Sequence, residues 1–599
     1  MTGRLIRAWL PAAAALTLAL GCGGRGSDTA HRGEPGGPAR VRFVDATERV
    51  GLGGFRQVNG SAAKPYILES FGAGVALFDV DGDGDLDVYL TNARALPDPA
   101  GDGEDRTPAY QATDKAATED ASGPPRDALY LNDGEGNFSD VTLARGLGDQ
   151  GWTTGVEVAD VDGDGRIDLF LTGYRAQALL MQRADGTFED ATARAGLASD
   201  RWSTGACFLD FDHDGDLDLY VANHIELDLA ALQASDAREE WYGERVYTGP
   251  RGLVAAPDRF YRNRGDGTFE DRSSAVGVDA IARYAFEAVA FDADGDGWVD
   301  VYVANDTQPN VLWRNVEGAR FEEIALRSGA ALSANGAAQA GMGVAVGDVD
   351  GDGVADLGVT NFSEDSSTLY LGRGATGFDD MTARARLIAP TRPYLGWSLG
   401  FDDLDLDGDV DLWCVNGHVF PQADRIATGM GYAQVNQAFL NDGDGRFRSA
   451  EDLGGGFDVK AASRGGAAGD LDRDGDIDLV IGNLDGPPTV LLNETARLGR
   501  AAFVRLVDRA PNTTAHGAVV TARIGKERRT RFVGTGSGFL SCSGSDVHFG
   551  LGAAARIDAL EVRWADGERE VYPGVEAGFH VVLDRTLGIV RRWPLGTPQ

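Results

Sequence analysis

A nine-residue acidic pattern, Asp-x-Asp-x-Asp-Gly-x-x-Asp, constrains the fold of this 599-residue chain more than any other feature. It occurs seven times without one missing acid, in copies that begin at Asp79, Asp160, Asp210, Asp292, Asp348, Asp403 and Asp470. Carboxylates this close together repel one another unless a cation neutralises them. The pattern therefore predicts a repeat architecture with a cation site in each copy.

The spacing within each copy is that of a calcium loop. Carboxylates at positions 1, 3 and 5 face inward, Gly at position 6 permits a sharp turn, position 7 offers its carbonyl, and Asp at position 9 closes the shell. An all-oxygen donor set favours a hard divalent cation over zinc, and magnesium requires a tighter octahedral geometry. Within the nine-residue loops the one Cys or His is His213, at position 4, where the side chain should point away from the ion. The cofactor prediction is therefore calcium, at about seven sites.

The predicted ligands are the four acids of each copy and the residue at position 7. The acids are Asp79, Asp81, Asp83 and Asp87; Asp160, Asp162, Asp164 and Asp168; Asp210, Asp212, Asp214 and Asp218; Asp292, Asp294, Asp296 and Asp300; Asp348, Asp350, Asp352 and Asp356; Asp403, Asp405, Asp407 and Asp411; and Asp470, Asp472, Asp474 and Asp478. The residues at position 7 are Asp85, Arg166, Asp216, Trp298, Val354, Asp409 and Asp476.

An EF-hand is the rival interpretation, because its loop begins in the same way but ends in a bidentate Glu at position 12 between two helices. Position 12 here is apolar or Cys: Leu90, Leu171, Val221, Val303, Val359, Cys414 or Ile481. The surrounding residues are β-branched and aromatic, as in strands. Each loop is therefore expected to join two strands.

A second repeated signature defines the rest of the unit. Phe-x-Asp-x-Thr followed by Gly-Leu occurs from Phe43, Phe138 and Phe188, with weaker copies later, and most copies follow a Leu-Tyr-Leu-Asn type strand and a Gly turn. Each repeat then holds four strands, which predicts an all-β fold with a seven-bladed β-propeller over residues 41–498. Because the first Phe-x-Asp strand precedes the first loop and the last repeat lacks one, residues 41–47 should complete the final blade. The surplus length falls in insertions at 93–127, expected to be mobile, 224–257 and 417–437.

The two ends of the chain have different compositions. Residues 1–22 have the charged and apolar regions of a secretory leader, and Leu18 to Cys22 resembles a bacterial lipobox that would lipidate Cys22, with ordinary signal-peptidase cleavage as the alternative. A tether, 23–40, follows. Residues 499–586 form a predicted small β-sandwich-like domain, and 587–599 a tail. Cys207, Cys414 and Cys542 are expected to be buried free thiols.

The repeats resemble FG-GAP/VCBS repeats, the calcium-loop repeats of integrin α-subunit heads, on the strength of residues 70–79 (Ser-Phe-Gly-Ala-Gly-Val-Ala-Leu-Phe-Asp). The C-terminal segment, with His516-Gly-Ala-Val-Val-Thr, 536–542, 548–552 and 562–567, resembles the ASPIC/UnbV domain. The pairing is that of the cartilage acidic protein family and its bacterial relatives. This resemblance implies an extracellular calcium-binding propeller. Ala565 departs from it, because relatives commonly carry Pro there.

The sequence leaves two functions open. The first is a binding or adhesion module, expected to be monomeric, for an extracellular protein or glycan. The second is a carbohydrate-active enzyme of lyase or dehydratase type, with a site at the axial mouth and His224 or His418 as weak catalytic candidates. Trp152, Trp202 and Trp397 are expected to fill the core rather than stack sugars. The net charge of −38 argues against nucleic acid and against electrostatic binding to anionic lipid, so membrane contact is expected only through a lipid anchor. The predicted location is the outer membrane or cell surface as a lipoprotein, otherwise the periplasm or the medium.

Overall fold

The computed structural model describes residues 41–96, 125–148, 150–235, 237–426, 429–450, 453–495, 499–534, 536 and 538–596. All of them belong to one compact unit, 40–599. The predicted leader, tether and lipidation site at Cys22 lie outside the described residues, as does most of the insertion 93–127. No helix in the described ranges has the length and apolar character that a membrane span needs.

Seven four-stranded antiparallel sheets of one design follow one another along the described part of the chain. The first four pair their strands in the order β2 (Val75–Phe78), β3 (Asp87–Leu90), β4 (Ala128–Asn132), β5 (Phe138–Asp140); β6 (Trp152–Ala159), β7 (Asp168–Tyr174), β8 (Ala178–Gln182), β9 (Phe188–Asp190); β10 (Ser203–Leu209), β11 (Asp218–Asn223), β14 (Arg259–Asn263), β15 (Phe269–Asp271); and β16 (Ala285–Phe291), β17 (Asp300–Asn305), β18 (Val311–Val316), β19 (Arg320–Glu323). The other three are β20 (Gly341–Gly347), β21 (Asp356–Asn361), β22 (Thr368–Gly372), β23 (Phe378–Asp380); β24 (Gly396–Asp402), β25 (Asp411–Asn416), β27 (Gln437–Asn441), β28 (Phe447–Ser449); and β30 (Ser463–Gly469), β31 (Asp478–Asn483), β32 (Thr489–Asn493), β1 (Phe43–Asp45).

Each sheet contains the four strands that the repeat predicts. The first strand leads into the acidic loop, the second begins at the Asp of position 9, the third carries the Leu-Tyr-Leu-Asn type residues, and the fourth is the Phe-x-Asp strand. Position 12 lies within the second strand in all seven sheets, so the loops join strands and the EF-hand alternative is wrong. The prediction of an all-β chain of antiparallel four-stranded sheets is confirmed.

The seven sheets are arranged in a closed circuit. The first strand of each sheet contacts the first strand of the next, from β2 through β6, β10, β16, β20 and β24 to β30, and β30 contacts β2 in turn. Strand β1 pairs with β32, with Phe43 opposite Asn493, so the start of the described chain supplies the outer strand of the last sheet. This pairing is the one that the register of the repeats predicts.

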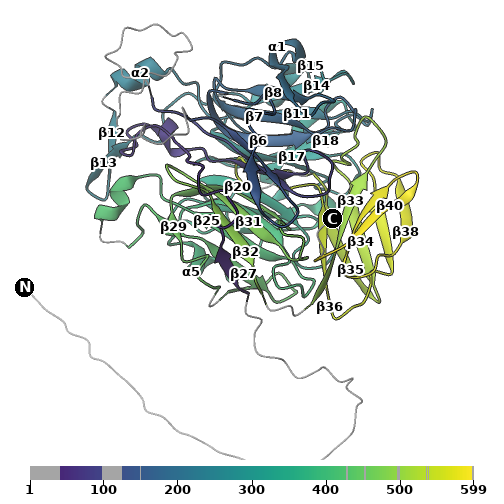
Figure 1. The fold of residues 1–599 in the computed structure, drawn as a ribbon. Helices are drawn as coiled ribbons and strands as arrows, with labels where there is room; N and C mark the ends of the chain where they lie inside the picture. Colours follow the sequence, from purple (N-terminus) through teal and green to yellow (C-terminus); the bar gives the residue numbers. More distant parts are fainter. Residues whose placement is uncertain are drawn as a thin grey trace, which may run out of the picture. The chain divides into compact units, whose positions relative to one another are not determined.

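Two further sheets form the C-terminal part of the chain (Figure 1, yellow). One contains β36 (Val547–Gly552), β33 (Arg500–Val507), β39 (Phe579–Asp584) and β40 (Gly588–Pro594), and the other contains β35 (Glu527–Phe532), β34 (Val519–Ile524), β37 (Ala559–Arg563) and β38 (Arg569–Pro573). Both sheets contribute to one apolar core that includes Val504, Val520, Phe549 and Trp564. Residues 588–594, which lie in the predicted tail 587–599, form β40 and pair with β39.

A segment of this C-terminal part, 538–543, lies against the first strands of the circuit. Gly538 exchanges two backbone hydrogen bonds of 2.8 Å with Val344 of β20, and Cys542 bonds to the backbone of Val75 and Leu77 of β2. The Leu540 N–H donates to Glu287 of β16. We call 538–543 the axial segment.

In five sheets the residue five positions before the loop is glycine, and the axial segment gives a steric reason for two of them. A Cβ on Gly74 would lie 2.3 Å from the Leu540 carbonyl oxygen, and one on Gly343 would lie 2.6 Å from that of Gly538.

The insertions at the opposite ends of the second strands contact one another. They contain α2 (Leu229–Ala234), β12 (Arg238–Trp241), β13 (Glu244–Tyr247), η4 (Pro421–Arg425) and β26 (Gln434–Val435), which pairs with β29 (Lys460–Ala461). Trp241 lies 4.7 Å from the ring of His418, and Tyr247 lies 4.9 Å from that of Phe420. The short helices that join sheets are η1 (Ile67–Ser70), α1 (Thr192–Ala195), α3 (Ser273–Val276), η2 (Val278–Ala280), α4 (Ala325–Ser328) and α5 (Ile388–Thr391), and η3 (Gly374–Thr376) lies between β22 and β23 of one sheet.

Candidate functional site

The Asp at position 9 anchors every acidic loop to its own sheet. One carboxylate oxygen accepts the backbone N–H of position 2, as in the 2.8 Å bond from Val80 to Asp87. The other oxygen accepts the backbone N–H of the last, or next to last, residue of the third strand, as in the 2.9 Å bond from Asn132 to Asp87. All seven copies make both bonds, so these carboxylates fix the loop conformation.

One further hydrogen bond and one backbone conformation shape the loops. In all seven copies the carboxylate at position 5 accepts the backbone N–H of position 7, at 2.9 to 3.2 Å. The Gly at position 6 has a φ of +84° to +106° throughout, a left-handed conformation that favours glycine. The sharp turn that the sequence predicts at this position is confirmed. Ligation through the carbonyl of position 7 stays a prediction.

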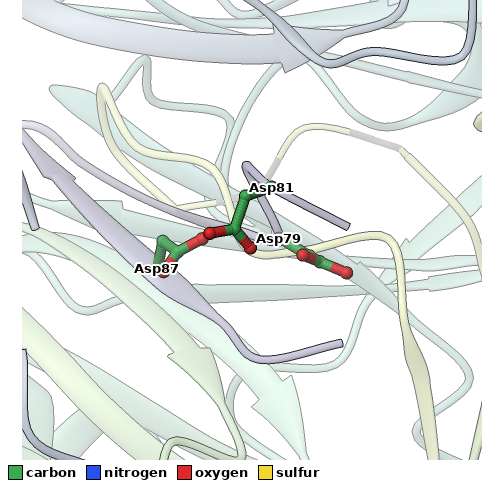
Figure 2. Close-up of side chains that lie close together, drawn as sticks. All are labelled: Asp79, Asp81 and Asp87. Carbon is green, nitrogen blue, oxygen red and sulfur yellow. The ribbon is translucent and has the colours of Figure 1, made fainter. Parts of the chain in front are cut away.

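The acids at positions 1, 3 and 9 lie close together, as Figure 2 shows for Asp79, Asp81 and Asp87. In this loop and in those beginning at Asp160, Asp292 and Asp348, one oxygen from each of the three acids lies within 4.8 Å of the others; in the loop beginning at Asp210 the three acids are those at positions 1, 3 and 5. Several of the inward oxygens are buried and have no hydrogen-bond partner. They are Oδ1 of Asp210, Asp212, Asp216, Asp348, Asp350 and Asp476 and both oxygens of Asp403.

Burial and crowding raise the pKa of these carboxyl groups in the absence of an ion. Burial is the main cause, and neighbouring carboxylates add to it: the pKa of Asp210 is raised to about 7, partly by Asp214, and that of Asp348 to about 6. Burial likewise raises the pKa of Asp87 to about 8. A positive charge nearby lowers the pKa of such groups and so favours their charged form at neutral pH.

Arginine side chains pair with the outer oxygens of several loop acids. Arg262 lies 2.5 Å from Oδ2 of Asp212 and 2.8 Å from Oδ2 of Asp214, and Arg373 lies 3.6 Å from Oδ2 of Asp350. The Oδ1 atoms of Asp212 and Asp350 remain without a partner. The donor set therefore fits a hard cation, because unpaired carboxylate oxygens converge on one side while the opposite oxygens are already held.

His213 takes no part in its own loop. Its ring stacks on Trp298 of the next sheet's loop, with centroids 3.8 Å apart and planes 3° from parallel. The prediction that His213 points away from the site is consistent with this stacking, which joins two neighbouring loops.

A second set of loop contacts was not predicted from the sequence. The amide side chain at or next to the end of the third strand donates to the carbonyl of position 2 in the preceding sheet's loop. Asn315, for example, donates to Phe211 O at 2.8 Å. Six sheets make this contact through Asn132, Gln182, Asn263, Asn315, Asn441 and Asn493, and Asn132 joins the first sheet to the last loop through Leu471 O. The sequence feature that could have predicted these contacts is the Asn at the end of the Leu-Tyr-Leu-Asn strand.

The two histidines that are weak catalytic candidates are buried. His224 and His418 are both 0% exposed. Burial lowers the pKa of each imidazole to about 3, so both are neutral at pH 7. His224 stacks on Phe286 at 4.5 Å, and His418 accepts the Phe420 N–H at 3.0 Å. Neither can exchange a proton with a substrate at the surface.

The three tryptophans fill the core as expected. Trp152, Trp202 and Trp397 belong to one apolar cluster with Phe71, Phe286, Phe539 and Leu540. Two of these partners, Phe539 and Leu540, come from the axial segment, so the C-terminal part of the chain supplies part of this core. Cys207, Cys414 and Cys542 are buried free thiols, which confirms that prediction.

Two protein-family models match stretches of the chain. A model described as FG-GAP-like repeat matches residues 113–171, 160–221, 247–303 and 292–359. A model described as ASPIC and UnbV matches residues 508–588.

The curated relatives that match are proteins named cartilage acidic protein 1. The Xenopus tropicalis protein is 28% identical over 296 residues, covering 48% of this chain and 42% of the relative. The Mus musculus protein is 25% identical over 393 residues, covering 56% and 60%, and the Homo sapiens protein 25% over 391 residues, covering 56% and 58%. The chain spans about half the length of the curated relatives it matches.

Two solved structures resemble the chain more distantly. One concerns specific recognition of non-reducing terminal N-acetylglucosamine by an Agrocybe aegerita protein, with 14% identity, coverage of 69% of this chain and 86% of that one, and a TM-score of 0.36. The other is BBS1N in complex with ARL6DN, with 9% identity, coverage of 76% and 97%, and a TM-score of 0.37.

Proposed function

Since the chain is an FG-GAP repeat protein with a C-terminal ASPIC and UnbV domain and is homologous to cartilage acidic protein 1, we propose that it is an extracellular, calcium-binding, seven-bladed propeller that serves as a binding or adhesion module. Its partner would be an extracellular protein or glycan. Support for seven blades comes from the seven like sheets among the described residues and from the closed circuit of their first strands.

The observation that carries the calcium proposal is the set of buried carboxylate oxygens of the loops that have no hydrogen-bond partner. The other oxygen of Asp212 and of Asp350 pairs with Arg, and that of Asp348 accepts the Gly353 N–H. Asp210 and Asp212 in one loop and Asp348 and Asp350 in another present this arrangement most plainly. A bound calcium ion would supply positive charge and cross-link the carboxylates of a loop. The residues that would hold it are the acids at positions 1, 3, 5 and 9.

A binding role is favoured over a catalytic one by the burial of His224 and His418 and by the axial segment at the inner strands. The insertions that follow the second strands, at the ends away from the acidic loops, would provide the contact surface for a partner. Tyr242, for example, is 52% exposed at the turn between β12 and β13. Aromatic side chains of this kind provide large contact areas for protein or glycan partners.

The calcium proposal predicts that Asp212→Ala removes one ion and part of the stabilisation by calcium. With dissociation constants of roughly 0.1 to 1 mM and about 1 mM free calcium, one site contributes about 0.4 to 1.4 kcal/mol by mass action. The measurement is the rise of Tm with calcium, together with the stoichiometry from titration calorimetry.

Asp266→Ala is the matched control, because Asp266 is an exposed turn acid that accepts hydrogen bonds from Thr268 and belongs to no acidic loop. Its calcium response should equal that of the wild type. An Asp212→Ala variant with the wild-type stoichiometry and calcium response would contradict the assignment of Asp212 as a ligand.

A further inference from the structure

The C-terminal domain contacts three of the acidic loops at the same atom, Oδ2 of the Asp at position 1. Arg505 of β33 lies 2.5 Å from Asp79, Arg563 at the end of β37 lies 2.9 Å from Asp292, and the Thr513 hydroxyl donates to Asp160. Each of these oxygens also accepts the N–H of the Gly at position 6, as in the 3.0 Å bond from Gly297 to Asp292. The domain thus reaches the outer side of carboxylates that are predicted to face an ion.

The charge of the domain is opposite to that of the surface it contacts. Residues 499–599 carry 14 Lys and Arg and 10 Asp and Glu, a formal charge of +4, whereas the whole chain carries −38. The two arginine contacts are also partly shielded from water, with side-chain exposures of 21% for Arg505 and 19% for Arg563. Coulomb interactions at such positions are screened less than those between exposed charges.

We propose that Arg563 holds the calcium affinity of the Asp292 loop below that of the loops without such a contact, an inference that rests on the proposed calcium binding. Its guanidinium already compensates part of the charge of Asp292 and repels a divalent cation beside the same carboxylate. The coupling is reciprocal: a cation in this loop weakens the contact between the loop and β37 by the same factor. Arg505 acts in the same way on the Asp79 loop, where Asp546 shares its guanidinium at 2.6 Å.

The Asp292 loop carries its own optical reporter. Trp298 stands at position 7 and is the one tryptophan within any of the seven nine-residue loops. Terbium(III) is a hard trivalent ion that takes oxygen ligands as calcium does, and excitation of a nearby indole sensitises its emission. Because Trp298 also stacks on His213 of the Asp210 loop, the titrations are made in an Asp212→Ala background, and the emission that Trp298→Phe then removes reports on the Asp292 loop.

The test is a terbium titration of the full chain, comparing wild type with Arg563→Gln and Arg563→Lys. In Arg563→Gln, the terbium concentration at half-maximal Trp298-dependent emission should fall by about tenfold or more. In Arg563→Lys, which keeps the charge, it should stay near the wild-type value. Arg528→Gln is the matched control: Arg528 lies in β35 of the same sheet and pairs with Glu561 at 2.9 Å. Its midpoint should not move.

An unchanged midpoint in Arg563→Gln would overturn this inference and leave the proposed calcium binding intact. Wild-type protein without any emission dependent on Trp298 would instead contradict binding at the loop itself. If Arg563→Gln fails to fold, hydrogen exchange measured on the wild-type protein still tests the proposal. Saturating calcium should speed hydrogen exchange in β37 residues 559–563, and exchange that stays the same or slows would count against the reciprocal coupling.

Discussion

At the scale of single residues, the buried histidines differ most from their expected roles. His224 lies within ring contact of Phe71, Trp202 and Phe286, with centroid distances of 5.6, 5.2 and 4.5 Å. Its Nδ1 lies 3.3 Å from the Ala285 carbonyl oxygen. The imidazole therefore acts as a core aromatic group that must stay neutral, and this gives it a pH-dependent effect on stability.

We predict that His224→Phe reduces the loss of stability on acidification. The folded-state pKa of about 3 lies below the unfolded value of about 6.5, so stability is fully present above pH 6.5 and is lost as the pH falls toward 3. Between pH 7 and pH 5 this one group costs about 2 kcal/mol. Urea unfolding at both pH values should show a drop smaller by about that amount in the variant. Equal drops would mean that His224 is not neutral in the folded protein.

The loops and the histidines differ in how far the sequence could predict them. The ligand set of a loop lies within nine consecutive residues, so its chemistry could be read directly from the spacing. The surroundings of His224 are contributed by Phe71 and Phe286, which are more than 60 residues away on either side. Only the closure of the circuit brings them together, and no local pattern reports such burial.

At the scale of elements, the amide bridges join each loop to its neighbour. Asn315 donates to Phe211 O at 2.8 Å and to Val299 O at 3.2 Å, and its Oδ1 accepts the Gly318 N–H at 2.9 Å. The fifth sheet is the exception among the seven, and sterics explain it: a Cβ on Gly372 would lie 2.2 Å from the Ala355 carbonyl oxygen. No side chain fits at that position.

We expect Asn315→Ala to lower the free energy of unfolding by about 1 to 3 kcal/mol, because it leaves two buried carbonyls and one N–H without a partner. Asn137→Ala is the control, since Asn137 is exposed and donates only to Asp133 in its turn. It should change stability by no more than about 0.5 kcal/mol. Equal effects of the two substitutions in chemical denaturation would show that the bridge adds nothing to stability.

The sequence predicted the elements better than the contacts between them. Alternating apolar residues and fixed turns gave four strands per repeat and the pairing of residues 41–47 with the last sheet. The amide bridges, the strand at 588–594 and the insertion of the axial segment depend on partners far away in the chain. The glycines five residues before the loops did indicate that another part of the chain comes close there, because Leu540 and Gly538 approach Gly74 and Gly343.

At the scale of the whole molecule, the acidic loops, the circuit of sheets and the C-terminal domain form one electrostatic system. The loops concentrate negative charge at the starts of the second strands, and the arginines of the C-terminal domain offset part of it. The remaining charge requires cations. Seven sites at roughly 0.1 to 1 mM affinity would together contribute about 3 to 10 kcal/mol, comparable with the whole stability of a domain.

Counting the ions bound to the intact chain tests this account most directly. The protein is dialysed to equilibrium against buffer with saturating calcium, and the bound calcium is the difference between the protein and buffer compartments in elemental analysis. Seven acidic loops with one shared sequence pattern predict about seven calcium ions per chain, with the Asp79 and Asp292 loops filling last. One or two ions per chain at saturating calcium would contradict the account.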